Sequence, residues 1–126
     1  MKALYVPSAV LALVLLFSLW TSSYTEQRAA QWLTELDKTG KLIDEERWDD
    51  AQSLLLAVHR DWEYHQVSFH LFLEHQDLDA AEELFSGVIA ACKQHDRVET
   101  YIQLEQLRTQ LAFLAETQAL NIQNIL

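Results

Sequence analysis

Glycine and proline, the residues that most often interrupt regular structure, are nearly missing from this chain. Its 126 residues include two glycines and one proline. The turns of β-sandwiches, collagen repeats, glycine-rich phosphate loops and proline-rich linkers all need more of these two residues. Neither residue occurs from residue 41 to residue 86. The sequence therefore predicts an all-α protein in which at least one helix is long.

Apolar residues recur at the three- and four-residue steps of a helix face throughout the chain after Thr25. The clearest series is Trp48, Ala51, Leu55, Val58, Trp62, His65, Phe69 and Phe72. A repeat of about 3.5 residues is typical of long helices that pack nearly parallel or antiparallel. Shorter series of the same kind come before and after it. The pattern predicts an antiparallel bundle of three to four helices with a shared core that includes Trp48, Trp62, Leu107 and Leu111.

Capping residues suggest where these helices begin and end. Gly40, which lies between two lysines, predicts the end of the first helix. The second helix is expected to reach Glu74. Asp79 and Glu82 have the spacing of a capping box at the start of the third helix, and Asp96 predicts the start of the last.

The N-terminal segment differs from the rest, because residues 3–25 have no charged side chain. Its eighteen-residue apolar run, residues 3–20, would span about 27 Å as a helix, close to the ~30 Å hydrocarbon core of a bilayer. We therefore expect a membrane anchor in residues 1–25 and an acidic helical domain in residues 26–126.

Two other interpretations of this segment stay open, a cleaved secretory signal and a buried core helix. A signal peptide usually ends in a site with small residues, and only residues 21–23 resemble one. For an uncleaved anchor, Lys2 and the acidic domain place the N-terminus in the cytoplasm and the domain outside, at the cell membrane.

Charge and cysteine content exclude several classes of function. The domain after residue 25 has a net charge near −11, because Lys2 is the one basic residue outside it. A surface this acidic does not suit nucleic acid, whose phosphates need basic side chains. The single cysteine, Cys92, excludes an internal disulfide and a cysteine-based zinc cluster. Its place on an apolar face predicts a buried, unreactive thiol.

Four residues near the end of the second helix are weak candidates for a metal site: His70, Glu74, His75 and Asp79. Each histidine has a carboxylate four residues later, so each pair could share a helix face. The two histidines are five residues apart, however, which is about 140° apart around a continuous helix. One ion could bind both pairs only if the chain breaks between them. Polar groups at a helix end are the simpler interpretation, so we expect neither a metal nor a cofactor.

The other candidate residues have structural interpretations. His65 lies on the apolar face between Trp62 and Phe69, where a core histidine is more common than a catalytic base. Trp48 and Trp62 are expected to be core residues, with an aromatic ligand cage as the alternative. The chain has no Ser-His-Asp order, HExxH, GxGxxG or P-loop motif. We expect no catalytic residues and no enzymatic activity.

Several residues, in their order along the chain, resemble a known protein family. They follow the apolar segment as Trp48-x-x-Ala51-x-x-x-Leu55, Trp62, Glu74-His75-x-x-Leu78-Asp79 and the terminal Asn124-Ile125-Leu126. The order resembles the bacterial family catalogued as domain of unknown function 4363, which is common in spore-forming Gram-positive bacteria. His59, His65 and His70 depart from that family's pattern. The resemblance covers nearly the whole chain and implies a membrane-attached helical domain, with no activity assigned.

Together these features favour a single-pass membrane protein whose helical domain is a non-catalytic interaction or accessory module at the cell envelope. Its expected partners are the membrane, through residues 3–20, and an unknown protein or a second copy of the chain. One alternative is an exported metal-binding or hydrolytic protein that uses the region from His70 to Asp79. Another is a structural homo-oligomer formed through the long second helix.

Overall fold

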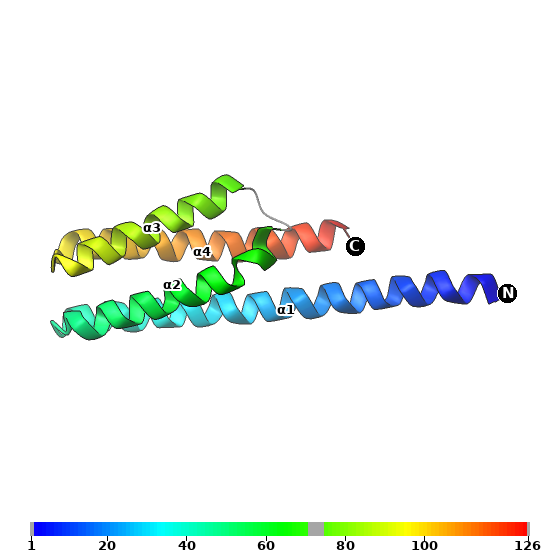
Figure 1. Cartoon of the computed structure of the whole chain (residues 1–126), viewed down its shortest axis with the longest axis horizontal. Coiled ribbons are helices and arrows are strands. Elements are labelled where there is room, and N and C mark those ends of the chain that lie inside the picture. The colour runs from blue at the N-terminus through cyan, green and yellow to red at the C-terminus, as the bar shows by residue number, and fades with distance from the viewer. Residues whose placement is uncertain (1, 71–74, 126) are drawn as a thin grey trace.

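The described residues form four helices, as predicted for an all-α bundle (Figure 1). The computed structural model describes residues 2–70 and 75–125, without the side chains of residues 2–4, 18, 21–26, 67–70 and 121–125. The helices are α1 (Lys2–Asp44), α2 (Trp48–His70), α3 (His75–Lys93) and α4 (Arg97–Ile125).

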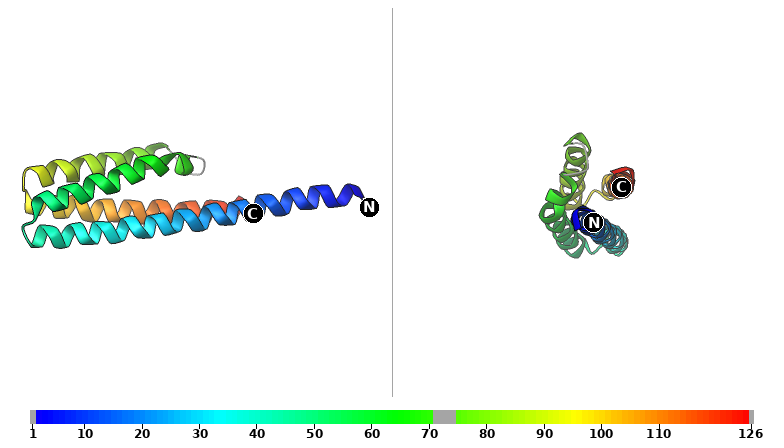
Figure 2. Two further views of the ribbon diagram at one scale, coloured as in Figure 1. Left: turned by 60° about the horizontal axis from the view of Figure 1, so that its bottom comes forward. Right: turned by 90° about the vertical axis from the view of Figure 1, so that its right-hand side faces the viewer.

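The helices are arranged as two antiparallel hairpins, α1–α2 and α3–α4, whose tight turns lie at the same end of the bundle (Figures 1 and 2). Helix α1 packs against α2 and α4, and α3 packs against the same two helices. Each helix therefore has two neighbours, and the apolar faces of all four meet in one core.

Both hairpin turns use the same helix-ending geometry, with a non-glycine residue in the left-handed conformation. In the first turn Glu46 has a φ of 59°, and the Arg47 amide donates to the Leu42 carbonyl at 2.9 Å. In the second turn His95 has a φ of 56°, and the Asp96 amide donates to the carbonyl of Ala91 at 3.1 Å. These six-to-one bonds define the Schellman motif. The two hairpins consequently turn in the same way.

The two hairpins also bury equivalent positions, each pair separated by 49 residues. In α1 and α3 the buried sets are Ala29, Trp32, Leu36, Thr39 and Ile43, and Leu78, Ala81, Phe85, Val88 and Cys92. In α2 and α4 they are Ala51, Leu55, Val58, Trp62 and His65, and Thr100, Leu104, Leu107, Leu111 and Leu114. The described bundle is therefore a structural repeat of one hairpin.

The predicted core is largely confirmed. Trp62, Leu107 and Leu111 are almost completely buried in one apolar cluster. Trp48 is only partly buried at the edge of this cluster, where its ring stacks on the ring of His95 with 4.9 Å between centroids. Cys92 is buried, and this burial raises the pKa of its thiol.

Two predicted helix boundaries were wrong. Gly40 does not end the first helix, because α1 continues to Asp44 and the left-handed residue that follows is Glu46. Glu82 is not in a capping box, because α3 begins at His75 and Glu82 lies in the second turn. Asp96 does cap α4, since its side chain accepts a hydrogen bond from the Glu99 amide at 3.1 Å. The predicted extension of the second helix to Glu74 lies outside the described residues.

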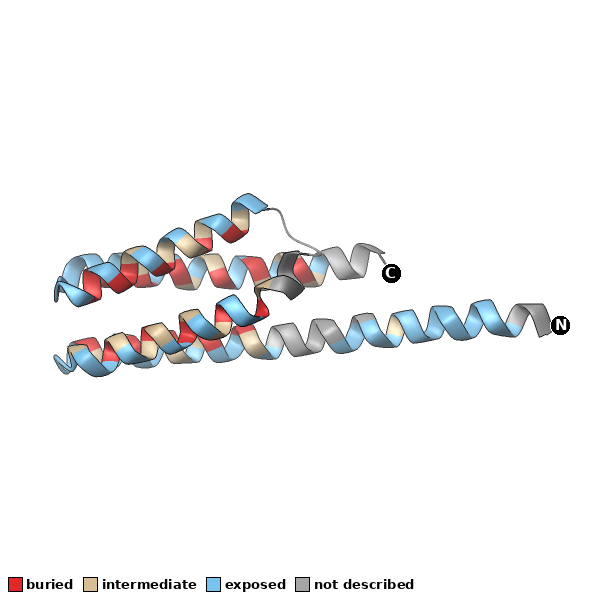
Figure 3. Ribbon diagram, viewed as in Figure 1, coloured by how far each residue is buried: buried red, intermediate tan, exposed pale blue. Residues whose placement is uncertain are grey.

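The N-terminal part of α1 extends beyond the bundle (Figure 2), and nearly all of its described residues are exposed (Figure 3). Its large exposed residues are Tyr5, Val6, Val10, Leu11, Leu13, Val14, Leu16, Phe17, Leu19 and Trp20. We call residues 5–20 the apolar extension. In the described part of the chain, no helix combines the length and hydropathy needed to cross a membrane. The predicted apolar run, residues 3–20, includes residues 3, 4 and 18, whose side chains are outside this description.

A buried amide on α4 leads to the first testable prediction. The side chain of Gln118 is 1% exposed, and neither its nitrogen nor its oxygen has a hydrogen-bond partner in the structure as described. An unpaired buried amide costs about 1–3 kcal/mol in proteins. We expect Gln118→Met to raise the free energy of unfolding by about that amount in urea denaturation. The control is Gln110→Met. The Gln110 amide donates to the Asp77 carbonyl at 3.0 Å, and this variant loses that hydrogen bond, so no gain in stability is expected. A loss of stability in Gln118→Met would show that the amide is paired.

Candidate functional site

The four residues predicted as weak metal ligands are only partly described. The side chain of His70 and the whole of Glu74 lie outside the described residues. His75 and Asp79 are both exposed, four residues apart in the first two turns of α3. The site formed by these four residues therefore stays a prediction.

His65 lies in the core, as the sequence predicted. It is 8% exposed, and its Nδ1 lies 2.9 Å from the backbone carbonyl oxygen of Asp61, one turn earlier on α2. Its ring meets the ring of Trp32 on α1 edge to face, with 6.3 Å between centroids. The contact with Trp32 packs α2 against α1, and the contact with Asp61 lies within α2.

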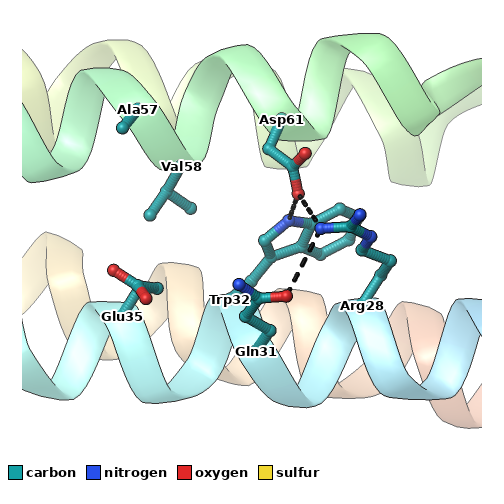
Figure 4. A pocket seen from close by; sticks show the side chains of 7 residues that line it. All are labelled: Arg28, Gln31, Trp32, Glu35, Ala57, Val58 and Asp61. Carbon is teal, nitrogen blue, oxygen red and sulfur yellow. Dashed lines mark hydrogen bonds and ion pairs between the residues drawn. The ribbon is translucent and has the colours of Figure 1, made fainter.

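A small hollow lies between α1 and α2 (Figure 4). We call it the α1–α2 hollow. Its lining residues are Arg28, Gln31, Trp32, Glu35, Ala57, Val58 and Asp61, and its volume is about 240 Å³. The Trp32 indole N–H donates to Asp61 Oδ2 at 2.6 Å. Arg28 Nη1 lies 3.6 Å from the same oxygen, and it donates to Gln31 Oε1 at 3.3 Å.

The chemistry of the α1–α2 hollow suits recognition better than reaction. Asp61 accepts the hydrogen bond that the buried Trp32 indole needs, and Arg28 offsets the charge of this carboxylate. Both charged side chains are about one third exposed, at 34% and 32%, so water screens the pair. Gln31 is exposed at this hollow, and its amide group can hydrogen-bond a polar side chain of a partner.

A second polar cluster lies between α2 and α3, and sequence reasoning missed it. His59 Nε2 lies 3.0 Å from Glu82 Oε2 and 3.2 Å from Glu63 Oε1. One atom from each residue falls within 4.8 Å of the other two. We call this the His59–Glu63–Glu82 cluster. His59 and Glu63 are four residues apart on one helix, a signal visible in the sequence, but Glu82 reaches them only through tertiary packing.

Core side chains hold two members of this cluster in place. The indole N–H of Trp62, which is fully buried, donates to Glu82 Oε1 at 2.8 Å and so leaves Oε2 for His59. The ring of His59 packs against the ring of Phe85, with 5.0 Å between centroids. The imidazole and the Glu82 carboxylate are therefore oriented by the folded bundle itself.

A third polar group joins the two hairpin turns. The Tyr101 hydroxyl donates to the carboxylate of Asp44 and lies 3.0 Å from the Gly40 carbonyl oxygen, and Arg97 donates to Asp44 at 3.1 Å. The hydrogen bond from Tyr101, followed by that from Arg97, lowers the pKa of the Asp44 carboxyl. Burial and the neighbouring Asp44 raise the pKa of the Tyr101 hydroxyl. This group fastens α4 to the end of α1.

Comparison with known proteins gives one match. The family model described as domain of unknown function (DUF4363) matches residues 19–125. No curated protein and no solved structure matches the chain. The matched residues include the whole of α2, α3 and α4, together with the part of α1 that packs in the bundle.

Proposed function

This chain belongs to the DUF4363 family, and we propose that it is a membrane-attached, non-catalytic module whose helical bundle binds a protein partner. The observation that supports this most is the apolar extension. The side chains of this extension are exposed in the structure, with Leu13 at 66%, Phe17 at 66% and Trp20 at 65% of their full exposure.

Ten large apolar side chains exposed to water in one segment are unfavourable. Soluble monomers seldom expose a contiguous apolar patch of more than a few hundred Å², and covering one is favourable by roughly 25 cal/mol per Å². A bilayer fits better than the rest of the chain, because the bundle core is already filled by its own four helices. Tyr5 and Trp20 lie near the two ends of the extension, where aromatic rings favour the headgroup region.

In this proposal the N-terminus lies in the cytoplasm and the bundle lies outside, because Lys2 precedes the apolar run and the bundle is strongly acidic. The acidic surface favours a neutral or basic partner, and attachment to a membrane concentrates the bundle beside partners in the same surface. The α1–α2 hollow is the part of the bundle that we expect the partner to contact.

The homo-oligomer alternative remains a prediction. In the described part of its apolar series, Ala51, Leu55, Val58 and Trp62 are at most 3% exposed and pack inside one chain. The side chains of Phe69 and Phe72 lie outside the description. A second copy of the chain could also pack against the apolar extension. The experiment below separates self-association from binding to a different protein.

The test uses the full-length chain in cells, with a photo-crosslinking residue at Gln31 in the α1–α2 hollow. We expect the chain in the membrane fraction and a crosslink to a different protein that weakens as salt rises, since exposed charges are screened within ~8 Å at physiological ionic strength. The matched control places the crosslinker at Thr109, which is exposed on α4 and away from the hollow. Recovery in the soluble fraction would contradict membrane attachment. A crosslink from Gln31 only to the chain itself would favour self-association.

A further inference from the structure

We propose that the His59–Glu63–Glu82 cluster is a binding site for a divalent transition metal ion, with zinc as the best fit. The three residue types are all zinc ligands, and they come from two helices that belong to different hairpins. This proposal does not depend on membrane attachment or on a protein partner.

The two distances from the His59 nitrogen are close to those of a zinc site. Zinc bonds to histidine nitrogen and carboxylate oxygen of ~2.0–2.2 Å place tetrahedral ligands about 3.3–3.6 Å from one another. His59 Nε2 already lies 3.0 Å from Glu82 Oε2 and 3.2 Å from Glu63 Oε1. The two carboxylate oxygens are within 4.8 Å, so a small rotation of Glu63, whose side chain is 53% exposed, would complete three of the four positions. Water from the exposed side would supply the fourth.

Proton counting also favours a cation among these groups. The nitrogen His59 Nε2 can hold one hydrogen, yet it faces two carboxylate oxygens at hydrogen-bond distance. The hydrogen bond of Nε2 goes to Glu82 Oε2, so the Glu63 carboxylate lies beside the imidazole at ion-pair distance without a hydrogen bond from it. A divalent ion in its place would accept the lone pair of Nε2 and neutralise both carboxylates. Its two positive charges match the two negative charges of Glu63 and Glu82.

The surroundings orient the ligands as outer groups do in metal sites. Trp62 donates to Glu82 Oε1 and directs Oε2 towards the proposed ion, and the Phe85 ring limits rotation of the imidazole. Such partners commonly change metal affinity by 10–100-fold. Because His59 and Glu63 belong to α2 and Glu82 to α3, the ion would join the α1–α2 hairpin to the α3–α4 hairpin.

The test measures zinc binding to the full chain, without a histidine tag and after removal of metal by a chelator. We expect one zinc ion per chain by calorimetry, visible absorption typical of a tetrahedral site with Co²⁺, and a rise in melting temperature of roughly 10 °C at a hundredfold excess over the dissociation constant. Mg²⁺ and Ca²⁺ should cause no such rise, because both ions prefer sites made of oxygen ligands alone.

Two variants with a matched control locate the ion. Glu82→Gln and Glu63→Gln should each weaken zinc binding at least tenfold. Glu82→Gln keeps an oxygen that can accept the Trp62 hydrogen bond, and Glu63 is exposed, so both variants should fold, as circular dichroism will verify. Glu83→Gln removes the same charge from the next residue of α3 and should bind zinc like the parent chain. The proposal is overturned if zinc does not bind, or if binding persists in both cluster variants, which would place the ion at other residues such as the predicted group around His75.

Discussion

Replacement of Trp62 by alanine should lower the free energy of unfolding of the bundle by about 3–5 kcal/mol. The side chain is 0% exposed. Its ring meets the ring of Trp32 edge to face at 5.6 Å, and its N–H is bonded to Glu82. The alanine variant would leave a cavity where three helices meet. For a small domain with a total stability of ~5–15 kcal/mol, this loss is a large fraction. Urea denaturation followed by circular dichroism will measure it.

Two further variants make this prediction specific. Tyr64→Ala removes another aromatic side chain from α2, but this one is 81% exposed, so its stability should change by no more than about 0.5 kcal/mol. Trp62→Phe keeps most of the ring and loses the bond to Glu82, so an intermediate loss is expected. If Trp62→Ala melts at the same temperature as the parent chain, Trp62 is a surface residue. That result would favour the alternative interpretation of Trp62 as part of an aromatic ligand cage.

The buried faces of the helices could be predicted from the sequence because burial follows helical periodicity. The apolar series from Ala51 to His65 and the series from Leu104 to Leu114 are core faces. The predicted members Phe69 and Phe72 lie outside the described side chains. The repeat between the hairpins was not visible, because equivalent positions share burial and little else. Trp62 corresponds to Leu111, and Trp32 corresponds to Ala81. Equivalent buried positions therefore hold side chains of very different volume, although the spacing of buried positions is the same in both hairpins.

The helix ends were harder to predict, because the structure does not use glycine for them. Gly40 suggested a cap, yet a side chain there would make only ordinary contacts, with its Cβ 3.7 Å from Leu104 Cδ2. The left-handed positions are occupied by Glu46 and His95. Nothing in the sequence marks these residues, since neither type favours that conformation as glycine does. Tertiary packing of the hairpins offsets their conformational cost.

The candidate metal site could be predicted only in part from the sequence. Its first two members, His59 and Glu63, have a helical spacing that can be recognised. The spacing of Glu82 from Asp79 instead predicted a capping box at the start of the third helix. The true neighbours of Glu82 depend on how α3 aligns with α2. That alignment is set by the buried Trp62 and Phe85, which are 6.0 Å apart between ring centroids, and by the residues between the two helices. Periodicity within one helix holds no information about it.

On the proposal that the apolar extension anchors the chain in a membrane, the substitution of two of its leucines by arginine should have the largest effect on where the protein is found. A charge near the centre of a membrane-spanning helix costs ~2.5–3.5 kcal/mol on insertion scales, so Leu13→Arg with Leu16→Arg costs about 5–7 kcal/mol. Both side chains are about two thirds exposed, at 66% and 64%, and they lie outside the bundle core. We therefore expect the chain to leave the membrane fraction while its bundle melts at an unchanged temperature. Fractionation of cells and thermal denaturation of the purified chain measure these two effects separately.

The control for this experiment is the pair Leu13→Ala with Leu16→Ala, which shortens the same side chains without adding charge and should leave the chain with the membrane. This comparison separates insertion into a bilayer from a specific contact made by the leucines. If the arginine pair stays in the membrane fraction, the apolar extension is not the anchor. A mature N-terminus near Tyr24 would instead identify residues before it as a cleaved secretory signal. In that case the bundle would be exported without a tether, and a partner would have to bind it from solution.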